Sequence, residues 1–366
     1  MNIAPHRYRG LDAVRGLCAL GVMLFHYRAH FGAAPFESWL APVYASGMYL
    51  VDVFFVMSGY LLATVYRGRS DFGGLAWARV ARLLPLHLAT LLLVAVLQYC
   101  YVYRHGAPFV YPLNDLRHFL LNALMLNSSG LQANFSFNGP AWSISVEWLA
   151  NLMLFAVLAL CRKRLLPFAI VLCLLAAWAL WAHTGHLLSY GLFKGWLDAN
   201  LLRGVVGFFA GVVLVYLRPL PVSPSGASAY VWDAGFLIAT AGLIFFLGSE
   251  PVRSVKGADF AFVLLLVPLL VASACHGDWT TRLLDVAPLR WLGHISFSVY
   301  LLHFPMQLLF ALVLDAPAAT YATMPVFSGY IVATLAFSWL AWTQLEKPAQ
   351  TWLKDLWRRK PVSARQ

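Results

Sequence analysis

The stretch Arg9–Phe31, RGLDAVRGLCALGVMLFHYRAHF, decides how this sequence is interpreted. It is long and apolar enough to cross a bilayer, yet it carries Asp12, Arg15 and His26. Charged side chains inside a membrane are costly and usually functional. Arg15 and His26 are eleven residues apart, so on a helix their side chains share one face and lie about 16 Å apart along the axis. The stretch therefore predicts a membrane helix with a cation near one side and an imidazole toward the other.

The composition of the whole chain indicates a multi-pass membrane protein. Of 366 residues, 61% are hydrophobic and only 11% are charged. The net charge of +11 would suit nucleic acid, but the basic residues lie mostly in short loops between apolar runs. Orientation in a lipid bilayer explains such loops better. We therefore expect the lipid bilayer, and no nucleic acid, as a partner.

Apolar runs of about twenty residues predict an all-α, polytopic bundle of about ten transmembrane helices. Basic residues precede the first run and no small-residue cleavage site follows it, so we expect that helix to stay uncleaved. Ten spans put nineteen of the 26 Lys and Arg residues on the side of the termini, which predicts that both termini are cytoplasmic. The predicted spans are 11–31, 42–66, 83–103, 141–161, 165–184, 199–217, 229–248, 258–276, 290–313 and 325–345.

Two segments fall outside this count. Asp115–Asn127, DLRHFLLNALMLN, has a helical pattern but is too short to span, so it predicts an interfacial or re-entrant helix on the outer side. Trp352–Lys360, WLKDLWRRK, predicts an amphipathic helix on the cytoplasmic surface. We accordingly divide the chain into a membrane domain, 1–350, and a cytoplasmic tail, 351–366.

Four ionisable residues on different spans are candidates for one shared site. Depths estimated at about 1.5 Å per residue put His26, Glu147, Asp52 and His303 in the outer half or the middle of the membrane. An imidazole with a carboxylate neighbour is a natural general base, so we expect His26 to be oriented by Glu147 or Asp52. The alternatives are a core histidine bonded to a neighbouring carbonyl, and acids that pair with cations for structure.

A second group of candidates lies toward the cytoplasm. Arg79 and Arg82, in ARVARLLP, share a helix face at i, i+3 spacing, and guanidinium groups suit bidentate phosphate binding. The alternative is simple positive-inside orientation. Ser58, Trp142, Ser143 and His303 are candidates for lining the site, although the small-residue pattern SGYLLA also favours close helix packing. The histidines and five scattered cysteines have no metal-ligand spacing, so we expect no metal site.

Several stretches together resemble the acyltransferase 3 family of bacterial membrane acyltransferases. The first helix, LDAVRGLCALGVMLFH, is similar to the opening motif of that family, with an arginine and a histidine separated by ten residues. The stretches DVFFVMSGYLL, ARVARLLP, WSISVEW, ISFSVYLLHFP and LEKP follow in matching order. The resemblance covers essentially the whole chain.

The resemblance implies transfer of an acyl group, commonly acetyl, from cytoplasmic acyl-CoA to a hydroxyl of a cell-surface glycan or glycolipid, in the bacterial inner membrane. It implies acyl-CoA as a co-substrate, with its nucleotide end held on the cytoplasmic side by Arg15, Arg79 and Arg82, and no bound cofactor. By the resemblance, His26 is the essential histidine, Arg15 its paired arginine, Arg79 and Arg82 the cytoplasmic arginine motif, and Glu147 the acid of the Trp-Ser motif. Two other functions remain open, a secondary transporter or exporter and an acyl carrier that feeds a separate transferase. No oligomeric state follows from these residues.

Overall fold

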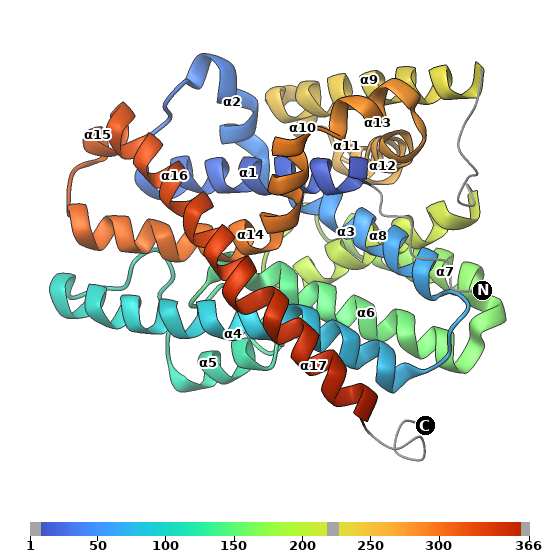
Figure 1. Ribbon diagram of the computed structural model, residues 1–366, viewed down its shortest axis with the longest axis horizontal. Helices are drawn as coiled ribbons and strands as arrows, with labels where there is room; N and C mark the ends of the chain where they lie inside the picture. Colours follow the sequence, from blue (N-terminus) through green and yellow to red (C-terminus); the bar gives the residue numbers. More distant parts are fainter. Residues whose placement is uncertain (1–8, 218–226, 360–366) are drawn as a thin grey trace.

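The computed structural model describes residues 9–217 and 227–359, which form a bundle of helices with one small antiparallel hairpin (Figure 1). The prediction of an all-α, polytopic membrane protein is confirmed. The elements are α1 (Arg9–Phe31), α2 (Glu37–Ser46), α3 (Leu50–Tyr66), α4 (Phe72–His105), α5 (Leu116–Ala123), α6 (Trp142–Cys161), α7 (Leu165–His183), β1 (Leu192–Phe193), β2 (Leu197–Asp198), α8 (Ala199–Leu217), α9 (Ala227–Gly248), α10 (Glu250–Arg253), α11 (Ala258–Ala261), α12 (Val267–His276), α13 (Asp278–Leu284), α14 (Ala287–Leu314), α15 (Ala318–Tyr321), α16 (Met324–Ala341) and α17 (Lys347–Arg359).

Short irregular turns join several of these helices without a break. Three are 3₁₀ turns: η1 (Gly47–Tyr49) joins α2 to α3, η3 (Arg162–Arg164) joins α6 to α7, and η2 (Gly139–Ala141) follows a loop and leads into α6. Two are π-helical turns, η4 (Phe262–Leu266) and η5 (Trp342–Glu346). Such π-turns in helices are frequent at functional sites, and η5 carries a residue of the candidate site described below.

Eight segments of the described residues are long and apolar enough to cross a membrane. One of them, Gly139–His183, contains two predicted spans, which η3 separates into α6 and α7. α1 is long enough, but its polar side chains keep it out of the eight. With α1 added and Gly139–His183 counted twice, the segments correspond to the ten predicted ranges.

The two ends of the described chain lie toward the same end of the bundle, as an even number of spans requires. The Arg9 end of α1 and the Arg359 end of α17 both lie toward the right of Figure 1. That this end faces the cytoplasm stays a prediction from the distribution of Lys and Arg. We call it the arginine end below, and the opposite end the outer end.

Close helix packing explains the small residues of the motifs. A Cβ atom on Gly293 of α14 would collide with the backbone of Asp12, so α1 and α14 approach closely there. A Cβ on Gly59 of α3 would collide with the carbonyl of Phe208 in α8. Small residues at such crossings let membrane helices pack backbone to backbone. The packing interpretation of SGYLLA is therefore confirmed for Gly59.

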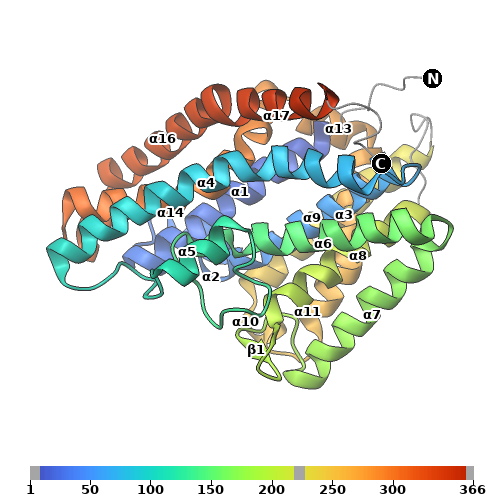
Figure 2. The ribbon, with the colours of Figure 1, turned by 90° about the horizontal axis from the view of Figure 1, so that it is seen from below.

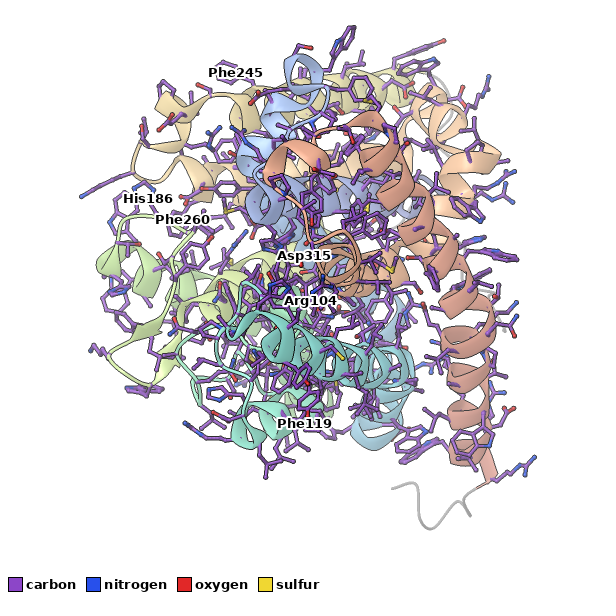
Figure 3. The ribbon with its side chains drawn as sticks, turned by 90° about the vertical axis from the view of Figure 1, so that its left-hand side faces the viewer. Arg104, Phe119, His186, Phe245, Phe260 and Asp315 are labelled. Carbon is purple, nitrogen blue, oxygen red and sulfur yellow. The ribbon has the colours of Figure 1, made fainter. Side chains whose placement is uncertain are left out.

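The outer segment between α4 and α6 is held by polar contacts. The predicted short helix appears as α5, which is too short to span and lies along α4 (Figure 2). His87 of α4 contacts the Asn122 carbonyl through Nε2 at 2.7 Å. At the outer tip of α4, Arg104 pairs with Asp315 at 2.8 Å and so joins α4 to the end of α14 (Figure 3).

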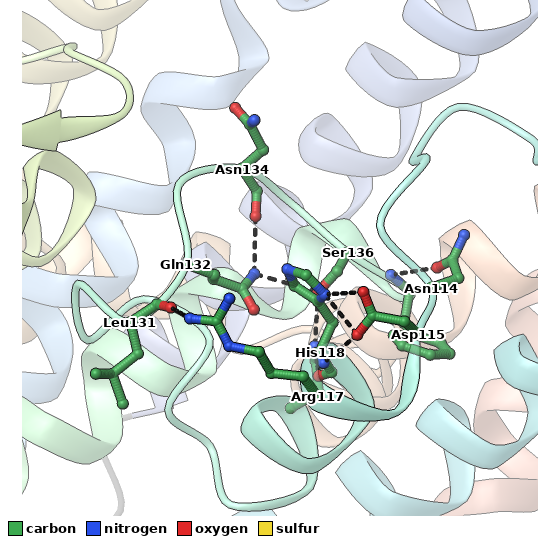
Figure 4. Close-up of polar contacts among 10 residues, drawn as sticks. Asn114, Asp115, Arg117, His118, Leu131, Gln132, Asn134 and Ser136 are labelled. Carbon is green, nitrogen blue, oxygen red and sulfur yellow. Dashed lines mark hydrogen bonds and ion pairs between the residues drawn. The ribbon is translucent and has the colours of Figure 1, made fainter.

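Side-chain caps fix the course of this outer segment (Figure 4). Asp115 accepts from the backbone N–H of His118 at 3.0 Å, which caps α5 and lowers the pKa of the carboxyl. The Arg117 side chain donates to the Leu131 carbonyl at 2.6 Å. Gln132 Nε2 donates to the Asn134 carbonyl at 2.8 Å and to the Ser136 hydroxyl at 3.2 Å. These contacts give the loop a defined shape without regular secondary structure.

The C-terminal helices continue one another. α16, η5 and α17 run without a break from Met324 to Arg359 (Figure 1). The tail predicted at 351–366 is helical as far as Arg359, and residues 360–366 lie outside the described residues. α17 packs on the start of α4, where Trp77 donates to the Leu353 carbonyl at 2.7 Å and its ring stacks on that of Trp357 at 5.8 Å. The predicted border at residue 350 therefore falls inside a helix.

Candidate functional site

A cavity of about 590 Å³ opens among α1, α3, α4, α6, α14 and η5. It contains all three arginines that the sequence analysis assigned to the cytoplasmic side of the site, Arg15, Arg79 and Arg82. Two of the candidate lining residues, Ser58 and Ser143, also lie on its wall. The other lining residues are Leu11, Asp12, Phe54, Phe55, Leu61, Leu62, Val65, Tyr66, Leu83, Ile144, Glu147, Gly293, His294, Ser296, Phe297, Tyr300 and Trp342.

A carboxylate holds each arginine of the cavity. Arg79 donates to Glu147 at 2.7 Å, and Ser58 donates to the same carboxylate oxygen at 3.0 Å. Arg15 lies 3.5 Å from Asp12 on its own helix. A guanidinium carries five N–H donors, so one carboxylate does not satisfy a whole guanidinium group. The site thus presents oriented guanidinium groups whose remaining N–H donors are suited to a further anion.

The Arg82 side chain is held by a residue of the C-terminal part of the chain. Its Nη1 donates to Glu346 of η5 at 2.8 Å, and the other Glu346 oxygen accepts from Ser298 of α14 at 2.8 Å. The guanidinium also lies 5.3 Å from the centre of the Phe297 ring, a cation–π distance. Glu346 is 2% exposed, so its contact with Arg82 is shielded from solvent and joins α4, α14 and η5.

His26 lies farther along α1, outside the lining of this cavity. Its ring centre is 4.9 Å from that of His303 and 5.3 Å from that of His30. His26 Nδ1 lies 2.9 Å from the Val22 carbonyl, which can only accept a hydrogen bond. Nδ1 therefore carries the proton of the neutral ring, and Nε2 is the free basic atom. His30 contacts Gln307 Oε1 through Nδ1 at 2.7 Å.

The backbone contact of His26 corresponds to the structural alternative weighed for this residue, a core histidine bonded to a neighbouring carbonyl. It does not exclude a basic role, since it occupies one ring nitrogen and fixes the tautomer. His303 is fully buried, and neither of its ring nitrogens makes a hydrogen bond within the described residues. A buried imidazole of this kind calls for a functional or structural explanation.

The expected contact between His26 and Glu147 is not found. Glu147 lies on the wall of the arginine cavity and contacts Arg79, although its depth was predicted to match that of His26. The prediction assumed that α6 begins at the membrane surface. α6 begins inside the bundle instead, because the loop before it enters the protein, with Asn138 donating to the Leu301 carbonyl at 2.9 Å. Figure 2 shows α4 extending well past the start of α6 toward the outer end.

The loop before α6 has irregular backbone inside the bundle, and the protein that covers it explains why this is tolerated. Non-helical backbone occurs within membranes only where protein or a hydrated cavity covers it. Ser128 and Ser136 are buried, and the backbone N–H of Ser128 donates to the Ser145 hydroxyl at 3.0 Å. The loop is therefore packed inside the protein near the start of α6.

Asp52 does not contact His26 either, and instead pairs with Arg203 of α8. Its two oxygens accept from Arg203 Nε at 2.9 Å and Nη2 at 2.8 Å, and the two side chains are 0% and 1% exposed. Trp142 lies outside the cavity, with its ring centre 5.5 Å from the Arg203 guanidinium carbon. Asp52 and Trp142 thus surround a buried arginine, in agreement with the structural alternative weighed for Asp52.

Sequence reasoning missed Glu346, Tyr300 and Arg203. Glu346 belongs to LEKP, a motif that was quoted but given no role. Tyr300 precedes His303 by three residues in SVYLLH and so shares its helix face. Arg203 lies within the predicted span 199–217 but was counted with the outer loops, so its position inside a membrane helix was not used as a signal. Within 9–217 and 227–359, no group of three or more His, Cys, Asp or Glu side chains is arranged to hold a metal ion.

Comparisons with known proteins agree with the motifs. A family model described as an acyltransferase domain matches residues 8–343. The peptidoglycan O-acetyltransferase OatA of Listeria monocytogenes is 24% identical, over 96% of this chain and 59% of its own length. The putative membrane-bound transacylase BcsY of Komagataeibacter xylinus is 27% identical, over 98% of this chain and 86% of its own.

A putative O-acetyltransferase of Staphylococcus aureus, SACOL0978, is 23% identical, over 93% of this chain and 56% of its own length. The chain thus spans little more than half the length of the Listeria and Staphylococcus relatives. No solved structure matches it. Because the family model covers nearly the whole chain, this protein belongs to the acyltransferase 3 family of membrane proteins.

Proposed function

We propose that this protein is a membrane O-acyltransferase. It moves an acyl group, with acetyl as the expected one, from cytoplasmic acyl-CoA to a hydroxyl of a cell-surface glycan or lipid-linked glycan. The observation that carries the proposal is that Arg15, Arg79 and Arg82 gather on one cavity, while His26 and His303 lie together farther toward the outer end. The bacterial inner membrane is the corresponding location.

The donor end of the reaction follows from the arginines. The phosphates of a CoA molecule are multiply charged, and guanidinium forks bind such groups bidentately. The pantetheine arm is long and thin, so it would enter the cavity between α3, α6 and α14 with its thioester leading. The distance of about 16 Å along α1 between Arg15 and His26 is the span that the arm covers.

The chemistry follows from the free nitrogen of His26. Nε2 takes the proton of the acceptor hydroxyl while that oxygen attacks the thioester carbonyl carbon. The tetrahedral intermediate collapses, the carbon–sulfur bond breaks, and the CoA sulfur leaves as a thiolate that recovers the proton from His26. The products are an ester and free CoA. In a covalent variant, His26 Nε2 attacks the thioester carbonyl carbon and the CoA thiolate leaves. The acceptor oxygen then attacks the acyl carbon, the bond to Nε2 breaks, and the hydroxyl proton passes to the thiolate.

The glycan acceptor is supported by the relatives. OatA of Listeria bears the name of a peptidoglycan O-acetyltransferase, and a glycan hydroxyl is the kind of acceptor that such a name implies. Polysaccharide modification is accordingly the role that we propose for this chain.

One experiment separates this function from transport and from acyl carriage. Purified protein in lipid nanodiscs is incubated with acetyl-CoA labelled in the acetyl group, with and without an acceptor glycan. We expect release of free CoA and label on the glycan. Label that stays on the protein would favour an acyl carrier. Absence of CoA release and of bound label, together with substrate flux in liposomes, would favour a transporter and reject the proposal.

A further inference from the structure

The arginine cavity ends at three side chains, two of which contact the third. Phe54 of α3, Ser143 of α6 and Tyr300 of α14 are the lining residues of their helices that lie farthest toward the outer end. The rings of Phe54 and Tyr300 meet edge to face at 5.8 Å, and Ser143 donates to the Tyr300 hydroxyl at 2.7 Å. We call these three side chains the inner wall of the cavity.

Tyr300 is the fixed part of this wall. Its hydroxyl donates to the Pro140 carbonyl at 2.8 Å while it accepts from Ser143. The residue is 5% exposed. Two hydrogen bonds to α6 and to the turn before it therefore hold the ring across the end of the cavity, and a buried aromatic ring held in this way moves only at a cost in free energy.

The histidines lie behind this wall. His303 is one helical turn beyond Tyr300 on α14, and the two rings are 5.8 Å apart. Neither His303 nor His26 lines the cavity. The ring of Tyr300 thus lies at the junction of the arginine cavity with the pair of histidines, where the thioester of a donor held by the arginines would come within reach of His26.

The polarity of the cavity orients a ligand that is charged at one end and apolar at the other. Arg15, Arg79 and Arg82 would hold the charged end, and the acyl end would then meet Phe54 and Tyr300. A longer acyl chain must displace the Tyr300 ring or leave the cavity. Overfilling a packed apolar site in this way is unfavourable.

We propose that Tyr300 is a specificity-determining residue that restricts the donor to short acyl thioesters. The inference rests on the proposed function, since it assumes an acyl-CoA donor, and it adds the acyl chain length and the residue that sets it. Phe54 of α3 limits the acyl chain length from the other side of the cavity, and the hydrogen bond from Ser143 holds the Tyr300 ring in place.

The test measures donor affinity, so that no acceptor needs to be known. The full chain in nanodiscs is loaded with labelled acetyl-CoA. The concentrations of unlabelled CoA, acetyl-CoA and hexanoyl-CoA that displace half of the label are then measured. We expect hexanoyl-CoA to compete about tenfold less well than acetyl-CoA with the wild type. In Tyr300→Ala this gap falls below about threefold, while the affinity for CoA itself is unchanged. Tyr300→Phe retains the ring but loses both hydrogen bonds of the hydroxyl, so the gap should narrow less than in Tyr300→Ala.

Two further variants keep the test decisive. Phe54→Ala opens the same wall from α3 and is expected to narrow the gap as well, which covers the case in which Tyr300→Ala does not fold. Tyr103→Ala removes a tyrosine that is 87% exposed on α4, and the gap should stay as in the wild type.

The outcomes separate this inference from the proposed function. A full gap in Tyr300→Ala, or equal losses of affinity for all three ligands, would overturn the role of Tyr300 alone. A wild type that binds neither CoA nor acetyl-CoA would overturn the proposed donor and, with it, the inference.

Discussion

The Arg79 guanidinium donates to the Glu147 carboxylate over 2.7 Å and thereby joins α4 to α6 at the wall of the arginine cavity. This contact places Glu147 in the arginine cavity, the proposed donor site, whereas its estimated depth suggested a place beside His26. Asp12, Glu147 and Glu346 formally balance the three arginines of the site. The ion pairs make a cluster of three arginines tolerable inside a bundle, because unpaired charges there would be costly.

Replacing Glu147 tests that assignment. Since Glu147 orients Arg79, Glu147→Gln should raise the KM for acyl-CoA about tenfold with a smaller effect on kcat. Ser58→Ala removes the other contact to the same oxygen and should have a weaker effect of the same kind. Steady-state kinetics with varied acyl-CoA provides both constants. A fall in kcat at constant KM would instead indicate that Glu147 acts in the catalytic step.

The arginines are tested by conservative substitution. Arg79→Lys and Arg82→Lys keep the charge but lose the planar fork, so each should weaken CoA binding about tenfold in a competition measurement. Arg164→Lys, an exposed arginine at the same end of the bundle, is the matched control and should bind CoA as the wild type does. Unchanged affinity in both cavity variants would remove these residues from the donor site.

Replacing His26 tests the chemistry. His26→Ala should lower turnover about 10²- to 10⁴-fold, as expected for loss of a general base or a nucleophile, and leave CoA affinity intact, because His26 does not line the cavity. A size-exclusion profile and a melting curve like those of the wild type establish that the variant is folded. Turnover near the wild-type rate would reject both forms of the mechanism.

The Asp52–Arg203 pair is expected to act on stability. Asp52→Ala leaves a buried arginine without its carboxylate and should destabilise the protein by about 3–5 kcal/mol, seen as a lower Tm in detergent. The double variant Asp52→Leu with Arg203→Met removes both charges and should recover much of that loss. Loss of turnover by Asp52→Ala at an unchanged Tm would mean that Asp52 serves the reaction.

The crossing of α3 and α8 gives a prediction about packing. A Cβ on Gly211 would collide with the Val56 carbonyl, so Gly211→Leu should force the helices apart and reduce the amount of folded protein in the membrane. Gly329→Leu is the matched control, because a Cβ at that helical glycine meets no atom within 4 Å. Quantitative blots of membrane fractions and melting curves compare the two. Equal levels of both variants would contradict close packing at this crossing.

Periodicity and apolar run length predicted the spans well, because every backbone polar group within a bilayer must be satisfied internally and helices do this best. The shared face of Arg15 and His26 was likewise predictable from helical spacing. What the sequence could not provide was the level of one helix relative to another. The start of α6 inside the bundle depends on the packed loop before it, and this shift moved Glu147 from the expected neighbourhood of His26 to that of Arg79.

The hydrogen-bonding partners of the buried polar residues could not be predicted from local sequence patterns either. The contact of Asp52 with Arg203 joins residues 151 positions apart, and that of Arg82 with Glu346 joins residues 264 positions apart. Such pairs follow from the three-dimensional arrangement of helices and leave no trace in spacing along one of them. The motifs did identify four residues that line one cavity, namely Ser58, Arg79, Arg82 and Ser143.

The unbroken helix from Met324 to Arg359 connects the arginine cavity with the C-terminal end of the described chain. η5 holds Arg82 through Glu346, and about three helical turns later Trp357 stacks on Trp77. We expect a shift of Arg82 on ligand entry to reach this pair of indole rings at the arginine end. Since the chain has fourteen tryptophans, the signal of the pair is the part of the intrinsic fluorescence change on ligand binding that Trp357→Phe removes.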